Sequence, residues 1–183
     1  MNSKPMRLHF WRRLLLLPAI ATLVAFAPGP ATSSTIQPRV LGWVEWAVLE
    51  AGDAKVKAKL DSGAKTGSIH AEDIEAFERD GEDWVRFRVP LATRKHASTH
   101  DHDLRLERPV VRTVLIKQHK RKSLRRYVVE MDFCVGGLRF TTPMTLADRS
   151  RFLYPVLLGR TALENRALID PARKYRADET CPQ

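Results

Sequence analysis

The stretch that decides the fold runs from Leu60 to Ala71 and reads LDSGAKTGSIHA. Its acidic residue, Asp61, directly follows residues 55–60, KVKAKL, in which lysine and apolar side chains alternate without exception. Strict alternation predicts a strand with three apolar side chains on its buried face and three lysines on the other. The small residues after Asp61 predict a turn. By itself Asp-Ser-Gly is an ordinary turn, so a chemical role for Asp61 needs support from the rest of the chain.

Further apolar segments, bounded by turn residues, predict a series of short strands. We expect these strands at residues 41–49, 68–71, 84–89, 109–116, 126–135, 138–142, 152–158 and 167–169. The run 152–158 is closed by Gly159 and is expected to be buried. Residues 72–77 show no clear period, and residues 161–164 predict one short helix. Many short strands with frequent turns predict an all-β, barrel-like domain.

Residues 1–34 have the pattern of an export signal. A basic start with Lys4 and three arginines precedes the apolar run 14–27, and small residues follow at 28–34. The run is short for a membrane span, which needs about 20 residues. We therefore expect export to the periplasm or cell envelope, and leave open whether the segment is cleaved or anchors the chain through residues 10–27. The expected domain covers residues 38–176, with a tail at 177–183.

Charge and cysteine content bear on the compartment and the partners. The formal net charge is +10, and removal of residues 1–34 takes away four basic and no acidic residues, which leaves +6. In an oxidising compartment Cys134 and Cys181 could form a disulfide, while a buried free thiol at Cys134 is equally consistent with the sequence. The chain has no Cys-x-x-Cys motif, which argues against a cysteine zinc site.

Several short pieces of sequence, spread over nearly the whole domain, carry a family resemblance. They are LGW at 41–43, KAKLDSGAKT at 57–66, HA at 70–71, VVR at 110–112, LLGRTA at 157–162 and DPAR at 170–173. Together they resemble the retropepsin-like aspartic proteases, and in particular a bacterial family labelled ATP-dependent zinc proteases and also described as retropepsin-like. The resemblance implies a closed acid-protease barrel with one short C-terminal helix, and it implies that Asp61 is the catalytic carboxylate.

The same resemblance implies an active-site turn with a supporting strand. The residues concerned are Ser62, Gly63, Ala64, Lys65, Thr66, His70, Gly159 and Arg160. Gly159 is expected to pack under the turn, and His70 to orient a loop by hydrogen bonding. Aspartic proteases use two carboxylates that share one proton, because like charges about 3 Å apart cannot both ionise. The chain has one Asp-Ser-Gly, so the second carboxylate is expected from another copy in a two-fold homodimer.

A histidine-rich segment raises the question of zinc. Its candidate ligands are His96, His100, Asp101, His102 and Asp103, and His70 lies elsewhere in the sequence. His100 and His102 would share one side of an extended chain. No well-spaced third and fourth ligands are evident, so a solvated loop is favoured. We expect no metal or other cofactor, with zinc-dependent hydrolysis as a lower-ranked alternative.

A basic hairpin is the most particular feature of the sequence, because no acidic residue lies between Glu107 and Glu130. By its position in retropepsin-like folds it would be the flap over the cleft. Its cations are Arg112, Lys117, Lys120, Arg121, Lys122, Arg125 and Arg126. Clustered cations steer anionic ligands, so we expect an acidic substrate such as a glutamate-rich peptide. A solvated hairpin that touches anionic lipid or cell-wall polymer explains the charge equally well.

These observations predict an exported aspartic endopeptidase that acts as a homodimer on a peptide or protein substrate. The alternative from another class is a catalytically silent module that binds anionic peptides or polymers at the envelope. Nucleic acid is not an expected partner, since no aromatic residue interrupts the basic hairpin tip to stack on bases.

Overall fold

The computed structural model describes residues 37–51, 53–91, 103–118, 121–177 and 181. The expected export signal at 1–34 and the loop histidines at 96, 100 and 102 lie outside these ranges. Within them, no helix is long and apolar enough to cross a membrane.

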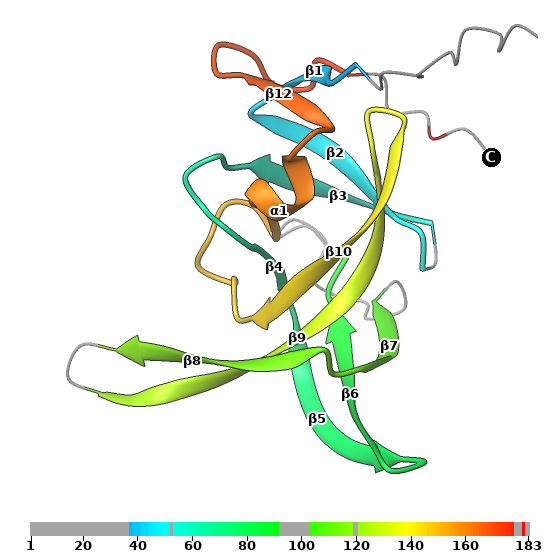
Figure 1. Ribbon diagram of the computed structural model, residues 1–183, viewed down its shortest axis with the longest axis vertical. Coiled ribbons are helices and arrows are strands. Elements are labelled where there is room, and N and C mark those ends of the chain that lie inside the picture. Colours follow the sequence, from blue (N-terminus) through cyan, green and yellow to red (C-terminus); the bar gives the residue numbers. More distant parts are fainter. Residues whose placement is uncertain (1–36, 52, 92–102, 119–120, 178–180, 182–183) are drawn as a thin grey trace, which may run out of the picture. The chain divides into compact units, whose positions relative to one another are not determined.

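The described part of the chain folds into twelve strands and one short helix, so the all-β prediction is confirmed (Figure 1). The strands are β1 (Arg39–Gly42), β2 (Val44–Leu49), β3 (Ala54–Leu60), β4 (Gly67–His70), β5 (Glu72–Arg79), β6 (Glu82–Val89), β7 (Leu104–Pro109), β8 (Arg112–Gln118), β9 (Arg121–Val135), β10 (Leu138–Ala147), β11 (Val156–Leu158) and β12 (Ala167–Asp170). The helix, α1, spans Arg160–Leu163.

A closed barrel of six strands forms the centre of the domain. The strand order is β10-β4-β11-β3-β2-β9, and pairing of β9 with β10 closes the ring. β11 lies between β3 and β4, parallel to the former and antiparallel to the latter. This arrangement sets the ends of β3 and β11 side by side, and Asp61 follows the first of these strands.

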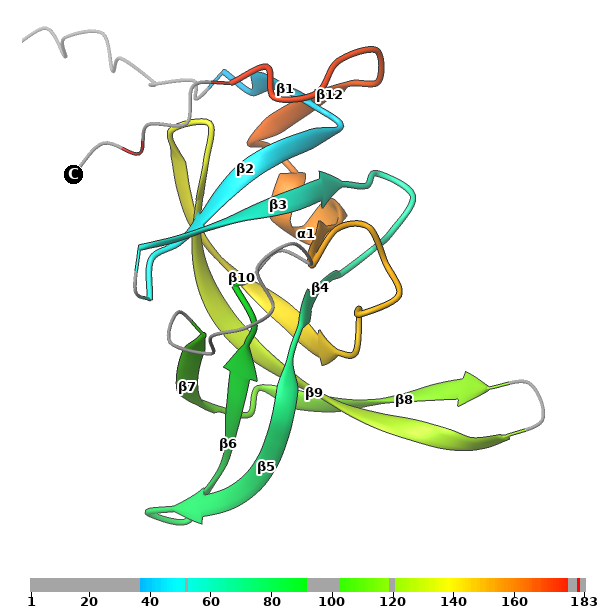
Figure 2. The same cartoon turned by 180° about the vertical axis from the view of Figure 1, so that it is seen from behind.

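Two elements extend beyond the barrel (Figures 1 and 2). The long β9 continues past the barrel and pairs with β8 in a hairpin. This hairpin projects on the side where the loop after β3 and the loop before β11 also lie (Figure 2). Strands β5, β6 and β7 form a separate antiparallel sheet.

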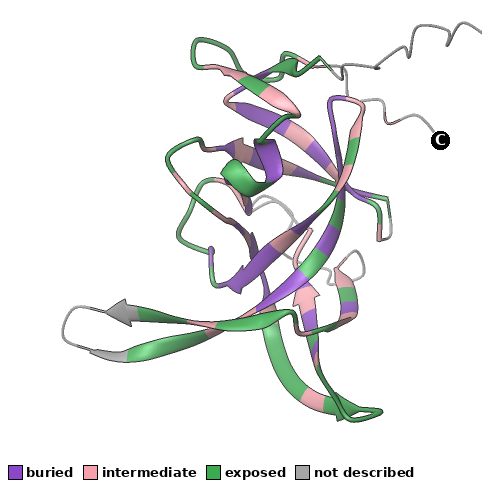
Figure 3. Cartoon of the chain, viewed as in Figure 1, coloured by how far each residue is buried: buried purple, intermediate pink, exposed green. Residues whose placement is uncertain are grey.

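One hydrophobic core serves the barrel and the separate sheet. The alternating residues Val56, Ala58 and Leu60 of β3 are buried in it, as predicted. Val85 and Phe87 of β6 belong to the same cluster. Figure 3 shows buried positions alternating along the barrel strands, whereas β5 and the described part of the β8–β9 hairpin are largely exposed.

Several predicted strand bounds were wrong. The run 152–158 is a strand only at Val156–Leu158, and the side chains of Phe152 and Leu153 are 62% and 81% exposed in the loop before it. Residues 41–49 are divided between β1 and β2. The hairpin strands run closer to the tip than expected, and residues 72–79 form a full strand, β5.

The C-terminal segment is held against the barrel by a disulfide and a buried carboxylate. Cys134 of β9 and Cys181 are bonded, with an S–S distance of 2.10 Å, so the free-thiol alternative does not hold in this structure. Glu45 of β2 is 1% exposed, and its Oε1 accepts hydrogen bonds from the backbone N–H groups of Gly42, Arg176 and Ala177.

Candidate active site

Asp61 lies where the chain leaves β3 and enters a tight turn. Its N–H donates to the carbonyl of Leu158 at 2.9 Å, and its carbonyl accepts the N–H of Ala64 at 3.2 Å. Its Oδ1 accepts the N–H of Gly63 at 3.0 Å, while Oδ2 lies 3.0 Å from Nζ of Lys59. The side chain is 26% exposed. The turn therefore presents a carboxylate to solvent in a fixed orientation.

The charge state of this carboxylate is set by its contacts. The hydrogen bond from Lys59 is the main cause that lowers the pKa of Asp61, and the N–H groups of Gly63 and Ala64 lower it further. Partial burial acts in the opposite direction. Asp61 of a single chain is thus ionised at neutral pH and able to accept a proton.

The start of α1 fastens the turn through its backbone. The N–H of Arg160 donates to the carbonyl of Ala64 at 2.9 Å, and that of Thr161 to the carbonyl of Lys65 at 3.0 Å. Arg160 Nη1 also donates to the carbonyl of Ser62 at 2.8 Å, across 98 residues of sequence. Free N–H groups at a helix start and free carbonyls in a turn satisfy one another here.

Gly159 allows this close approach. A Cβ at this position would lie 2.6 Å from the carbonyl oxygen of Thr66 and 2.9 Å from that of Ala64. Both are backbone atoms, which cannot move without displacing the turn. The structure thus brings Gly159 and Arg160 against the Asp61 turn, as the resemblance implied, and leaves Ser62 and Lys65 exposed at its surface.

Strand pairing defines which side chains share a side of the barrel with Asp61. Lys59 pairs with Leu157, Leu157 with Ser68, Ser68 with Thr145, and Thr145 with Val128. Directly paired residues point to the same face of a sheet. These five residues therefore form one row, the Lys59 row, that crosses β3, β11, β4, β10 and β9. Because Lys59 contacts the carboxylate, the row begins beside Asp61.

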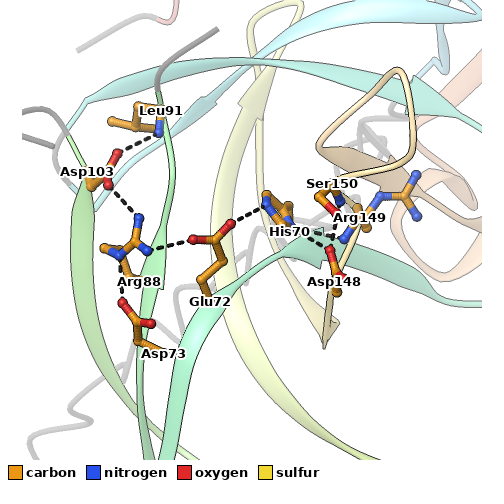
Figure 4. Close-up of polar contacts among 9 residues, drawn as sticks. All are labelled: His70, Glu72, Asp73, Arg88, Leu91, Asp103, Asp148, Arg149 and Ser150. Carbon is orange, nitrogen blue, oxygen red and sulfur yellow. Dashed lines mark hydrogen bonds and ion pairs between the residues drawn. The ribbon is translucent and has the colours of Figure 1, made fainter. Parts of the chain in front are cut away.

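His70 anchors the loop that precedes β11. It is buried, and its Nδ1 accepts the backbone N–H of Arg149 at 2.9 Å. Its Nε2 lies 3.1 Å from Oε1 of Glu72, so the network assigns the proton to Nε2. Figure 4 shows His70 between Glu72 on one side and Arg149 with Asp148 on the other. This geometry fits the expected role of orienting a loop.

An arginine-centred cluster continues this network into the separate sheet (Figure 4). Arg88 of β6 bonds Glu72 at 2.6 Å, Asp73 at 2.8 Å and Asp103 at 2.6 Å. Three carboxylates around one guanidinium raise the pKa of Arg88, and the hydrogen bond that Arg88 donates to Asp73 is the largest cause. The cluster joins β5, β6 and the start of β7 to the loop that His70 holds.

The cations of the hairpin do not share one environment. Arg112 and Arg125 line a pocket of about 410 Å³ at the hairpin base, together with Trp84 and Tyr127. Arg126, next in sequence to both Arg125 and Tyr127, points to the other side of β9. The side chains of Lys117, Lys120, Arg121 and Lys122 lie outside the described residues.

Metal ligation has no support in the described ranges. Within them, no group of three or more His, Cys, Asp or Glu side chains is arranged to hold an ion. Asp103, one of the candidate zinc ligands, accepts hydrogen bonds from Arg88 and from the N–H of Leu91.

Two functional candidates were missed from the sequence. Lys59 was assigned only to a polar strand face, although its spacing of two from Asp61 puts both on one side of the chain. Arg149 lies in a loop without any pattern, and no sequence signal marks its burial. The first could have been found from strand geometry, whereas the second depends on the fold.

Comparison with known proteins shows the family of this chain. The family described as RimB-like, retropepsin-like aspartic endopeptidase RimB, matches residues 40–180. A protein of Desulfotalea psychrophila named probable alpha-L-glutamate ligase is 37% identical over 142 residues, which cover 76% of this chain and 30% of that protein. A protein of the same name from Shewanella pealeana is 37% identical over 138 residues, 74% of this chain and 29% of its own length. The chain thus spans under a third of these curated relatives.

A solved structure shares the fold. The crystal structure of a Legionella pneumophila protein of unknown function superposes with a TM-score of 0.64 and 34% sequence identity. The match covers 76% of this chain and 98% of that one.

Proposed function

Because the chain belongs to the RimB-like family of retropepsin-like aspartic endopeptidases, we propose that it hydrolyses peptide bonds with Asp61 as its catalytic carboxylate. The observation that carries this proposal is the Asp61 turn. A partly exposed carboxylate is held by Gly63 and fastened from below by Gly159 and Arg160. Such a rigid presentation of one acid is what acid–base hydrolysis needs.

The second carboxylate is supplied by a second copy of the chain. In a two-fold dimer the two Asp61 side chains share one proton. The ionised one accepts a proton from the attacking water, and the protonated one donates a hydrogen bond to the scissile carbonyl. Lys59 favours the ionised form on each chain, so the approach of the partner's charge must raise one of the two pKa values.

We propose an acidic peptide as the substrate, and α-linked glutamate residues in particular. The hairpin is rich in arginine and lysine, and such cations attract anionic ligands before contact. The name of the relatives describes enzymes that join glutamate, and this chain corresponds to about 30% of their length. A hydrolase that cleaves glutamate chains would act on the product of such a ligase.

Export to the periplasm or envelope is proposed on two grounds. Residues 1–34 have the pattern of an export signal, and the disulfide between Cys134 and Cys181 suits an oxidising compartment.

The test is Asp61→Asn in purified protein with the disulfide intact. Cleavage of an α-linked oligoglutamate peptide should be abolished, while the circular dichroism spectrum and the thermal midpoint stay close to those of the wild type. Wild-type protein should sediment as a dimer at concentrations that support cleavage. Equal cleavage by the Asn variant, or cleavage by a strict monomer, would overturn the two-carboxylate mechanism. A wild-type protein that binds the peptide without cleaving it would indicate the binding-module alternative.

A further inference from the structure

A buried arginine on the Asp61 side of the barrel has no acidic partner among the residues that the structure describes. Arg149 is 8% exposed. Its Nη1 donates to Oγ of Ser68 at 2.8 Å, and its Nε donates to the carbonyl of Tyr154 at 3.2 Å. Its ring contact is with Phe152, 4.6 Å from the guanidinium carbon. In the described part of the chain, neutral groups alone contact this cation.

A second arginine lies next to it on the projecting strand. Thr145 of β10 pairs with Val128 of β9, and continuing this antiparallel register by two residues places Arg126 beside Ala147. Arg126 points to the same side as Val128, because side chains two apart share a face. Its Nε is buried and, among described residues, has no hydrogen-bond partner. A buried guanidinium N–H without a hydrogen-bond acceptor is rare, so a bound ligand with an acceptor atom would explain it.

The electrostatics agree with this placement. Burial lowers the pKa of Arg149, and the charge of Arg126 lowers it further. Two positive charges that lie close enough to repel each other also attract an anion strongly to the space between them. Neighbouring carboxylates are engaged elsewhere: Asp148 accepts the N–H of Ser150 at 2.9 Å, and Glu72 bonds Arg88 and His70.

The two arginines stand within reach of a peptide held at Asp61. Ser68, which Arg149 contacts, belongs to the Lys59 row and is two strands from Lys59. Two strand spacings of about 4.8 Å correspond to about three residues of an extended peptide. Any group bound there would therefore flank the scissile bond.

We propose that Arg126 and Arg149 form an anion subsite beside Asp61 that binds one carboxylate of the substrate. The proposal rests on the proposed function in so far as it takes the ligand to be a substrate. The planar guanidinium suits bidentate contact with a carboxylate, which would also satisfy the free Nε of Arg126. The carboxylate comes either from an acidic side chain near the cleaved bond or from a free peptide C-terminus.

Arg126→Gln is the variant to test, since Arg149 also holds its loop and its loss risks unfolding. Arg105→Gln is the matched control, because Arg105 is an exposed arginine of β7, in the separate sheet and not in the hairpin. The probes are an α-linked oligoglutamate peptide, a set in which each glutamate in turn is replaced by glutamine, and the same peptides with amidated C-termini. For each enzyme, kcat/KM is compared between the parent peptide and each neutralised peptide.

In the wild type, neutralising the one carboxylate that meets the subsite should lower kcat/KM by about 10- to 100-fold. The ratio of kcat/KM for the charged peptide to kcat/KM for its neutralised counterpart should be about tenfold smaller in Arg126→Gln than in the wild type. Arg105→Gln should keep the wild-type ratio. If a glutamine substitution causes the loss, the carboxylate is a side chain; if amidation causes it, the carboxylate is the C-terminus. If glutamine replacement and C-terminal amidation lower kcat/KM by the same factors in Arg126→Gln as in the wild type, the subsite is overturned and the proposed function is left standing.

Binding separates the two proposals. Fluorescence anisotropy with labelled oligoglutamate, in an Asp61→Asn background, should show about tenfold weaker affinity when Arg126→Gln is added. The wild-type protein could cleave none of the peptides and still bind oligoglutamate in a way that depends on Arg126 and not on Arg105. In that case the subsite stands and the hydrolytic function falls. Binding that is indifferent to Arg126 would overturn the subsite irrespective of turnover.

Discussion

Lys59 governs the chemistry of Asp61 at the scale of single residues. The ammonium lies 3.0 Å from Oδ2 and is the largest cause of the lowered pKa. In the proposed dimer, an easily ionised carboxylate would serve as the base of the pair, and a second Asp61 brought close would compete with this lysine. We therefore expect Lys59 to influence the pH at which the shared proton is lost.

Replacing Lys59 by methionine should move the acid limb of the pH profile to higher pH. The lysine stabilises the ionised carboxylate, so its removal raises the pKa of Asp61 and the fully protonated, inactive form persists to higher pH. The measurement is kcat/KM against pH, with Lys57→Met as the control, because Lys57 lies over the ring of Trp46 instead. An acid limb that does not move, or moves down, would contradict the role of Lys59.

At the scale of elements, the contact of β11 and α1 with the Asp61 turn converts a common turn into a fixed site. Two backbone N–H groups at the start of the helix donate to turn carbonyls, and Gly159 lets the two backbones touch. The turn alone has no hydrophobic anchor, so its rigidity comes from this contact.

Gly159→Ala should destabilise the fold by about 1–3 kcal/mol and lower activity further than stability alone explains. The added methyl would meet the carbonyl of Thr66 at 2.6 Å, and relief requires the turn to shift. Urea unfolding and peptide cleavage measure the two effects. Gly81→Ala is the comparison: it sits at φ +79° in open space, so it costs backbone strain but leaves the active site unchanged.

Element by element, the period-two pattern predicted β3 because that strand buries one face, and apolar segments bounded by turn residues predicted β6 and β9. The pattern failed for β5, which is exposed along most of its length and is joined to β6 by ion pairs such as Arg88 with Glu72. It failed again at Phe152 and Leu153, where apolar residues that would normally be buried lie in an exposed loop. Exposed apolar residues of this kind are available to a substrate or a partner chain.

At the scale of the whole molecule, the C-terminal segment closes the domain. Glu45 accepts three backbone N–H groups within the barrel wall, and the Cys134–Cys181 bond adds a covalent tie across 47 residues. The segment contains no strand or helix after β12 among the described residues, so these ties hold it in place.

Loss of the disulfide should lower the free energy of unfolding by about 2–4 kcal/mol, because the reduced unfolded chain gains the entropy of an open loop. Denaturant titration of the Cys134→Ala and Cys181→Ala double variant checks this, with reductant-treated wild type as the companion sample. Unchanged stability in both would show that the bond does not constrain the protein in solution.

The sequence by itself determined the all-β, barrel-like class and the strand that carries Asp61, because one-sided burial and turn chemistry are local properties; the family resemblance singled out Asp61 as the candidate acid. Apart from Lys59, which lies two residues before Asp61, tertiary structure decided what surrounds that acid. Ser68, Arg126 and Arg149 come to the Asp61 side of the barrel through the pairing of strands, and register depends on pairing between segments far apart in the chain. The physical reason is that a period-two pattern says which face a residue takes, but not which neighbour it meets there.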